Sequence, residues 1–240
     1  MAAFLKDITP FIGTGEKNED GLTLEEFLEE YHPEKYKNPC STTDILVIRK
    51  NGRIQSIETG LKLLMIKRRN HPSIGLWALP GGFVEIEEDL EAGAKRELEE
   101  ETGLKGIPLE QMRTWGEAFR DPRARVITTS YLAVVEDTLW QVKAGDDAKE
   151  AVWMDVVIKK ISSQEVLEER GERIKEIYEL LLTEEETKEE LCSKVLVSYN
   201  KTGILREMEY KVISNQGIAF DHPRVIVQAL LYIKRNIKEK

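Results

Sequence analysis

The chain has 240 residues, of which 41% are hydrophobic and 33% are charged, and its formal net charge is −9. This composition is typical of a globular protein with one large domain, or one domain with an appendage. The acidic balance argues against a nucleic-acid partner, and no stretch approaches the roughly 18 apolar residues that a membrane helix needs. Cys40 and Cys192 are too few for a disulfide framework and predict free thiols in the cytoplasm.

The N-terminal part predicts a short helix followed by two strands. Residues 23–31 (TLEEFLEEY) have an amphipathic pattern, and Thr23 and Glu26 have the spacing of a capping box. Residues 43–49 (TDILVIR) and 61–67 (LKLLMIK) are apolar runs bounded by turn residues, which is typical of strands.

The middle of the chain predicts a turn, a long helix and two further strands. Residues 79–82 (LPGG) suit neither a helix nor a strand. Residues 89–102 have strong helix character, and Gly103 stands where a C-terminal glycine cap belongs. The β-branched segment 125–136 and the segment 150–156 predict strands.

The last third predicts a helix over 164–182, a hairpin over 195–214 and a closing helix over 223–237. This mixture of elements favours the α+β class with a mixed β-sheet. The expected regions are an N-terminal helix and connector, a core, and a helix-hairpin-helix extension packed on that core. They cover residues 1–40, 41–157 and 158–240, respectively.

Carboxylates converge on one side of the helix predicted over 89–102. At about 100° per residue, Glu97 and Glu101 lie one turn apart beside the apolar stripe, with Glu100 on their flank and Glu99 on the opposite side. Like charges at this spacing repel, and the end of a helix favours cations instead. A hard divalent cation such as Mg²⁺ would resolve the conflict, although a glutamate run alone is also typical of a solvated surface.

Residues 82–104 (GFVEIEEDLEAGAKRELEEETGL) fit the pattern G-x5-E-x7-R-E-U-x-E-E-x-G-U at every fixed position, where U is a bulky aliphatic residue. This is the Nudix box, and the chain resembles the Nudix hydrolases. The segments FRDPR (119–123), AGDDA (144–148) and AFDH (219–222) resemble a narrower group. That group contains ADP-ribose pyrophosphatases and Nudix-related transcriptional regulators of NAD metabolism.

The resemblance implies an α/β/α sandwich with a mixed sheet and a C-terminal helical extension. It also implies a catalytic metal site for Mg²⁺, with Mn²⁺ as an alternative. The implied metal ligands are Glu97, Glu100, Glu101 and the backbone carbonyl of Gly81 or of its neighbour.

The resemblance assigns supporting roles to residues around this site. Gly82 would shape the loop, and Glu88 would pair with Arg96 to brace the loop against the helix. An acidic residue in the loop before the 150–156 strand would act as a further ligand or catalytic base, and we expect this to be Asp147, with Asp146 as the alternative.

Candidate substrate contacts lie outside the box. Arg120, Arg123 and Arg125 are candidate phosphate ligands, because a guanidinium matches phosphate oxygens bidentately, and we expect one or two of them, with Arg120 and Arg125 favoured, to contact the ligand. Trp77 is a candidate substrate contact, although a place in the core is favoured for it. His222 is a candidate catalytic base. However, Asp221 before it and Pro223 after it predict the start of a helix, so a place in the helix cap is favoured for His222 over a role as base.

The expected reaction is metal-dependent hydrolysis of the pyrophosphate bond of a nucleotide-type substrate, namely ADP-ribose, to AMP and ribose 5-phosphate. Two alternatives remain: a nucleoside triphosphate pyrophosphatase, and a non-catalytic ADP-ribose sensor or regulator. Regulators of the resembled group carry a winged helix after the AFDH segment, whereas here 18 residues follow His222, which favours the enzyme. The resemblance also implies a homodimer.

Overall fold

The computed structural model describes residues 4–35, 37–136, 140, 142–144, 148–168, 171–204 and 207–237. It divides into two units, residues 1–39 and 40–240. The first unit contains the predicted helix, α1 (Leu24–Glu30), and two short 3-10 helices, η1 (Thr9–Phe11) and η2 (Pro33–Lys35). The capping box is confirmed, because Thr23 Oγ1 accepts from the Glu26 amide at 3.2 Å and the Glu26 carboxylate accepts from the Thr23 amide at 2.8 Å.

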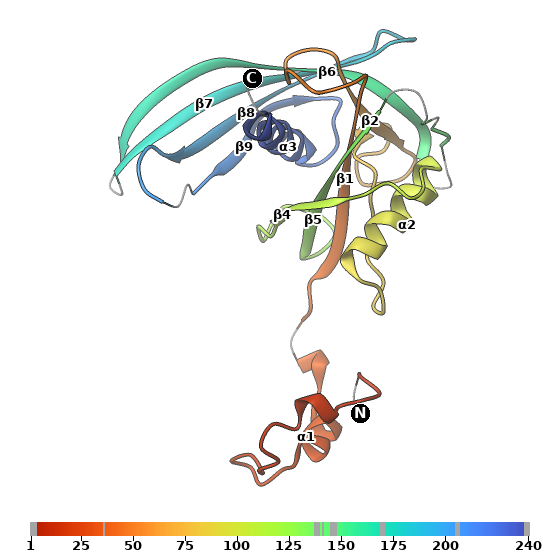
Figure 1. Ribbon diagram of the computed structural model, residues 1–240, viewed down its shortest axis with the longest axis vertical. Coiled ribbons are helices and arrows are strands. Elements are labelled where there is room, and N and C mark those ends of the chain that lie inside the picture. Colours follow the sequence, from red (N-terminus) through yellow and green to blue (C-terminus); the bar gives the residue numbers. More distant parts are fainter. Residues whose placement is uncertain are drawn as a thin grey trace. The chain divides into compact units, whose positions relative to one another are not determined.

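The second unit is built on one mixed sheet, whose strands run in the order β4-β5-β1-β2-β6-β7-β8-β9, with β3 paired to β2 (Figure 1). Strands β1 and β5 are parallel, and the other pairs are antiparallel. The elements in chain order are β1 (Cys40–Lys50), β2 (Leu61–Arg68), β3 (Trp77–Ala78), α2 (Leu90–Thr102), β4 (Glu110–Trp115), β5 (Val126–Glu136), β6 (Ala148–Glu168), β7 (Gly171–Glu184), β8 (Glu190–Asn200), β9 (Glu209–Gln216) and α3 (His222–Asn236).

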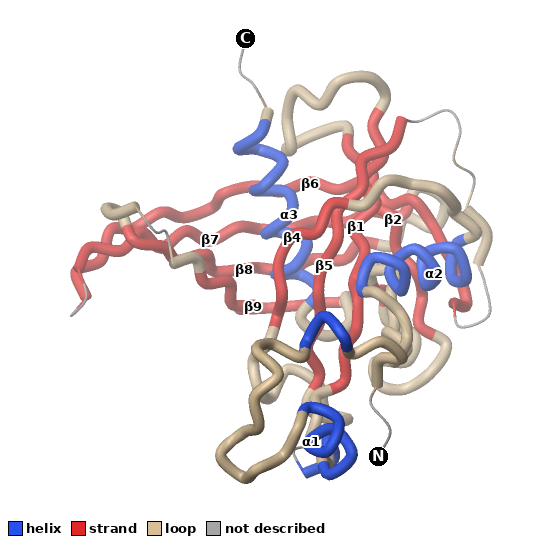
Figure 2. Tube along the Cα trace, turned by 60° about the horizontal axis from the view of Figure 1, so that its bottom comes forward, coloured by secondary structure: helices blue, strands red, loops and turns tan. Residues whose placement is uncertain are grey.

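Strand β1 lies between two cores. Its side chains alternate, so that Ile45 and Val47 join a cluster with residues of α2, whereas Leu46 and Ile48 join a second cluster with residues of α3. A strand buried on both faces has a continuous apolar run, as the ILVI segment has. Figures 1 and 2 show α2 and α3 on opposite sides of β1. The expected α/β/α sandwich with a mixed sheet is therefore confirmed.

Helix α2 ends as predicted. Gly103 has a φ of +74°, and its amide donates to the Glu99 carbonyl at 2.8 Å. This left-handed conformation is available to glycine without the steric cost that a Cβ brings. The helix end, and with it the last turn that carries the glutamates, is set by local sequence.

The predicted helix over 164–182 is wrong, because these residues belong to β6 and β7. Glutamate, lysine and leucine favour helix locally, but burial in β7 alternates with period two, and Tyr178, Leu180 and Leu182 face the core. Pairing with β6 on one side and β8 on the other outweighs local preference. Strand β6 also runs without interruption across the expected boundary between residues 157 and 158.

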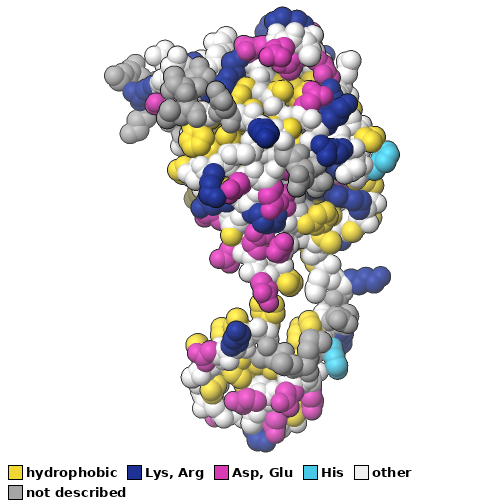
Figure 3. Space-filling view, turned by 90° about the vertical axis from the view of Figure 1, so that its right-hand side faces the viewer, with side chains coloured by type: hydrophobic (Ala, Val, Ile, Leu, Met, Phe, Trp, Pro, Cys, Tyr) yellow, Lys and Arg dark blue, Asp and Glu magenta, His cyan; other side chains and the backbone are white. Residues whose placement is uncertain are grey.

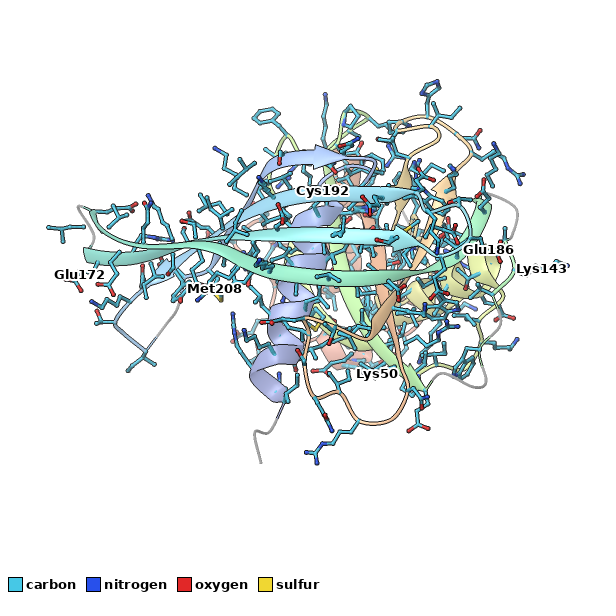
Figure 4. All side chains as sticks on the ribbon, turned by 90° about the horizontal axis from the view of Figure 1, so that it is seen from above. Lys50, Lys143, Glu172, Glu186, Cys192 and Met208 are labelled. Atoms are coloured by element: carbon cyan, nitrogen blue, oxygen red, sulfur yellow. The ribbon has the colours of Figure 1, made fainter. Side chains whose placement is uncertain are left out.

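The rest of the extension follows the prediction. Strands β8 and β9 form the hairpin, and α3 is the closing helix. Figure 4 shows α3 crossing the strands of this part of the sheet, with Cys192 on β8. Both cysteines are free thiols, as expected. The short strand β3 and strand β4 lie outside the predicted elements. Within the described ranges, no helix is long and apolar enough to cross a membrane.

Candidate functional site

The loop over residues 79–82 is docked against β1 by its backbone. The Ile45 amide donates to the Pro80 carbonyl at 2.8 Å, and the Thr43 amide donates to the Gly82 carbonyl at 2.9 Å. Gly81 has a φ of +144°, and a Cβ there would lie 2.0 Å from the Thr43 carbonyl oxygen. Glycine is therefore required at this position, both for its backbone conformation and for the close approach to β1.

Two glutamates of α2 reach this loop. The Gly81 amide donates to Glu101 Oε2 at 2.8 Å, and Glu101 is only 7% exposed. Glu97 lies against Gly82, where an added Cβ would be 2.5 Å from Glu97 Oε2. Burial raises the pKa of Glu97, although Arg96 opposes this effect. The spacing of one helical turn thus brings Glu97 and Glu101 to the same glycine pair, whereas the Glu100 side chain is 57% exposed.

Arg96 connects the helix with the start of the loop that precedes it. Its Nε and Nη2 donate to the two carboxylate oxygens of Glu88 at 2.9 and 3.0 Å, and Nη2 also donates to the Phe83 carbonyl at 2.9 Å. Its Nη1 donates to Glu97 at 2.8 Å and to Glu100 at 3.1 Å. Hydrogen bonds from Arg96 lower the pKa of Glu88, which stays ionised.

The donor set around the glycine pair fits a hard divalent cation. Carboxylate oxygens of Glu97, Glu100 and Glu101 and a backbone carbonyl are the ligands that Mg²⁺ and Mn²⁺ prefer. Within the described residues, no three carboxylate, imidazole or thiol groups converge on one point as a finished metal site. Glu97 and Glu100 do not converge on one point, in part because each directs a carboxylate oxygen to Arg96 Nη1.

A cavity of about 320 Å³ opens beside these carboxylates. It lies where β1, β2 and the 79–82 loop meet the segment before β5 and the start of α3. Its wall combines both signs of charge, and Figure 3 shows a similar mixture of acidic and basic side chains over one face of the molecule. The charged side chains lining it are Asp44, Arg68, Arg69, Glu97, Glu101, Arg120, Asp121 and Arg123.

The predicted substrate contacts lie in three different environments. Arg120 lines the cavity, but its guanidinium is paired with Asp221 through bonds of 3.1 and 2.7 Å. Arg125 is exposed and lies outside the cavity lining. Trp77 is 1% exposed in the apolar core, outside the lining as well. Of the candidate arginines, Arg120 and Arg123 line the cavity, whereas Arg125 does not.

The start of α3 differs in detail from the expected cap. The helix begins at His222, after Asp221 and with Pro223 in its first turn, as predicted. The Asp221 side chain makes no capping hydrogen bond and instead accepts from Arg120 and Arg224. Burial raises the pKa of Asp221, but the charges of Arg120 and Arg224 outweigh this effect and hold the pKa below its usual value.

Asp44 and Phe220 line the cavity and were not singled out from the sequence. Asp44 is 8% exposed, and burial raises its pKa. The signal that could have identified it is a carboxylate at the head of the fully buried ILVI run. Phe220 has a φ of +50°, and its ring lies 5.0 Å from the Arg68 guanidinium.

The acidic pair Asp146 and Asp147 lies outside the described residues. An acidic side chain that the structure does place at the cavity is Asp121. Its carboxylate accepts from Arg123 Nε at 3.0 Å and from Nη2 at 2.9 Å, and these bonds lower its pKa.

Comparison with protein families finds a match of the NUDIX domain to residues 39–181. Over 118 residues the chain is 39% identical to the ADPR responsive transcriptional repressor NtrR of Acinetobacter baylyi, covering 48% of this chain and 44% of the relative. Over 100 residues it is 44% identical to an ADP-ribose pyrophosphatase of Methanocaldococcus jannaschii. This match covers 42% of this chain and 58% of that relative. The chain spans about half the length of these curated relatives.

Among solved structures, a MutT/nudix family protein from Enterococcus faecalis is similar over most of this chain. The match covers 91% of this chain and 72% of that one, with a TM-score of 0.62 and 29% sequence identity. The similarity therefore extends beyond the segment matched to the NUDIX domain.

Proposed function

The chain belongs to the NUDIX domain family, and from this premise we propose that it is a metal-dependent hydrolase of ADP-ribose. Water would attack the pyrophosphate linkage and release AMP and ribose 5-phosphate. The observation that carries the proposal is the meeting of Glu97 and Glu101 with the Gly81–Gly82 backbone at a cavity that arginines also line. The pyrophosphatase relative supports the choice of substrate.

We propose Glu97, Glu100, Glu101 and the Gly81 carbonyl as the ligands of the metal, which is Mg²⁺ with Mn²⁺ as a substitute. When bound, the metal supplies charge neutralisation of the diphosphate and activation of the attacking water. The protein's part is to hold these oxygens in place, and Arg96 does so by connecting α2 to Glu88 and to the Phe83 carbonyl.

We propose that Arg120, which lies outside the Nudix box, binds the substrate. It is already oriented by Asp221, and its side chain is only 7% exposed, so little further ordering is required of it. Its positive charge compensates part of the negative charge that a diphosphate brings into a site with several carboxylates.

Asp147 is our proposed additional ligand or base. Its test is a pair of substitutions, in which Asp121 serves as the comparison because it lines the cavity and its carboxylate is already engaged by Arg123. We expect Asp147→Asn to lower kcat more than Asp121→Asn does. Equal effects in steady-state assays would contradict the assignment of Asp147.

A second candidate function is ADP-ribose sensing, favoured by the 39% identity to the repressor of Acinetobacter baylyi. A sensor binds the same ligand but has no use for turnover. The two functions are separated by measuring binding and hydrolysis on one sample. Tight binding of ADP-ribose in the presence of Mg²⁺ without formation of AMP would favour the sensor.

The decisive experiment is a substrate screen with Mg²⁺ that compares ADP-ribose, dinucleoside polyphosphates, sugar nucleotides and nucleoside triphosphates. We expect the highest kcat/KM for ADP-ribose, with AMP and ribose 5-phosphate as products. Glu101→Gln, measured in parallel, controls for a contaminating hydrolase. A preference for triphosphates with release of pyrophosphate would replace the proposed substrate with the nucleotide-cleaning alternative.

We further propose that the protein works in the cytoplasm as a homodimer. The free thiols of Cys40 and Cys192 fit a reducing compartment. The oligomeric state is measured by size-exclusion chromatography with light scattering, in which a mass near twice the chain's 27.6 kDa is expected.

A further inference from the structure

His222, the first residue of α3, is hydrogen-bonded to the loop that carries the glycine pair. It is 5% exposed, and its Nδ1 accepts from the Leu79 amide at 3.0 Å. Leu79 stands two residues before Gly81, whose own amide donates to Glu101. One imidazole nitrogen therefore connects a C-terminal helix to the loop at the proposed metal site.

The same bond determines which nitrogen of His222 carries the proton. A ring nitrogen that accepts a hydrogen bond is unprotonated, so the neutral ring has its proton on Nε2. Nε2 lies 3.5 Å from Asp44 Oδ1, and Asp44 is itself buried. The carboxylate is suited to stabilise the Nε2–H form, as in the carboxylate–histidine pairs that orient ligands of metal sites.

The neighbourhood of His222 supports a neutral ring. Burial lowers the pKa of His222. Asp44 on β1 and Asp221 at the start of α3 oppose this effect, whereas Arg120 before β5 and Arg68 on β2 reinforce it. Protonation would place a proton on Nδ1 and remove the acceptor of the Leu79 amide.

The backbone around His222 is anchored to the same segment of chain as the loop. The Trp77 amide donates to the Gly217 carbonyl at 2.9 Å, and the Ala219 amide donates to the Trp77 carbonyl at 2.7 Å. Arg120 and Arg224 both bind the carboxylate of Asp221. The start of α3 is therefore a fixed support for the strand β3 and for the loop after it.

We propose that His222 is a positioning residue that holds the 79–82 loop, and with it the Gly81 carbonyl and Glu101, in the geometry required for metal binding. Asp44 holds the imidazole in the tautomer that this role needs. The inference rests on the proposed metal-dependent function. It excludes His222 as the base for water, because Nδ1 is occupied by the Leu79 amide and Nε2 faces Asp44.

The test compares two substitutions of similar size in the 240-residue chain. His222→Gln keeps a neutral acceptor for the Leu79 amide, and His222→Leu does not. We expect His222→Leu to weaken Mn²⁺ binding, measured by calorimetry without substrate, and to lower kcat, each by about 10- to 100-fold, with a smaller change in KM. His222→Gln is expected to restore most of both losses, and His32→Gln, in the other unit, serves as the unchanged control.

Wild-type metal affinity and kcat in His222→Leu would overturn the inference. Equal losses in both variants with unchanged melting temperatures would also overturn it, because glutamine retains the acceptor. These outcomes differ from failure of the proposed function itself. In that case ADP-ribose is not hydrolysed by the wild type, whereas Mn²⁺ binding still reports on the loop.

A measurement on the wild type avoids any folding defect of the variants. The chain has three histidines, so ¹⁵N NMR of the imidazoles, assigned with His32→Gln and His71→Gln, resolves each ring. We expect His222 to show an unprotonated Nδ1 and a protonated Nε2 at neutral pH. A protonated Nδ1 would overturn the inference, since it cannot accept from Leu79.

Discussion

Glu97, Glu100 and Glu101 are neighbours in sequence but differ in their surroundings. Glu101 is buried against the Gly81 amide, Glu97 is partly buried against Gly82, and Glu100 is mostly exposed. Burial removes much of the hydration of a carboxylate, and without a bound metal this lowers the stability of the fold. A buried glutamate of this kind therefore indicates a functional site. The residue with the most confined geometry should therefore be the most sensitive to substitution.

Glu101→Gln is expected to lower kcat by about a hundredfold or more while leaving the melting temperature nearly unchanged. Glutamine still accepts from the Gly81 amide, so the loop keeps its contact, but the charge that a metal needs is lost. The matched control is Glu99→Gln, because Glu99 is exposed on the same helix and pairs with Lys105. Full activity of Glu101→Gln would contradict its place as a ligand.

Arg120 and Arg125 were equal candidates in the sequence, and the structure separates them. Removing Arg120 leaves the largely buried Asp221 with Arg224 as its remaining cationic partner, so Arg120→Ala is expected to cost about 1–3 kcal/mol in the free energy of unfolding and to raise KM. Arg125→Ala, at an exposed position, should change stability by less than about 0.5 kcal/mol. Urea denaturation and steady-state kinetics of both variants check the comparison.

At the scale of elements, the start of α3 should make stability depend on pH. Burial lowers the pKa of His222 below its ordinary 6.5. The unfolded chain then binds the proton first, so the contribution of neutral His222 is complete above pH 6.5 and is lost as the pH falls below it. The expected slope is at most about 1.4 kcal/mol per pH unit for one proton.

Urea denaturation of wild type and His222→Gln between pH 8 and pH 5 (about the range in which histidine titrates) measures this contribution. Burial raises the pKa of Asp44, so its own contribution is complete below pH 3.8 and is lost as the pH rises. Because His222 itself lowers the pKa of Asp44, the difference between the two pH profiles reports on the coupled pair of His222 and Asp44. Parallel profiles would contradict a neutral, buried imidazole.

Strand β7 is the element whose secondary structure depends most on tertiary contacts. Leu180 is fully buried between the sheet and α3, whereas Leu167 on β6 is 81% exposed. Leu180→Ala should therefore lower the free energy of unfolding by about 2–5 kcal/mol. Leu167→Ala should change it by less than about 0.5 kcal/mol, and similar effects in urea denaturation would contradict the strand register.

At the scale of the whole molecule, a net charge of −9 opposes the binding of the proposed anionic substrate, and bound cations would offset that charge. Chelation with EDTA is expected to abolish turnover, and added Mg²⁺ or Mn²⁺ to restore it. Mn²⁺ at about a hundred times its Kd should also stabilise the folded protein by about 2.7 kcal/mol. Thermal unfolding with and without Mn²⁺ checks this, and Glu101→Gln, which lacks a ligand, should show a smaller shift.

The sequence by itself determined the features that depend on local spacing. The capping box of α1, the glycine cap of α2, the β8–β9 hairpin and the shared face of Glu97 and Glu101 follow from residues a few positions apart. Helical geometry relates such residues in the same way wherever the helix lies. Helical spacing thus placed Glu97 and Glu101 on one face, whereas the prediction of a metal site there came from the resemblance to the Nudix box.

Only the tertiary structure decided what depends on segments meeting from far apart in the chain. The Arg120–Asp221 pair spans 101 positions, and the bond from Leu79 to His222 spans 143. The same holds for Trp77, which is placed in the core, and for β7, where strand pairing overrides helical preference. Hydrogen bonds and burial are properties of the neighbours that folding brings together, and local sequence does not specify those neighbours.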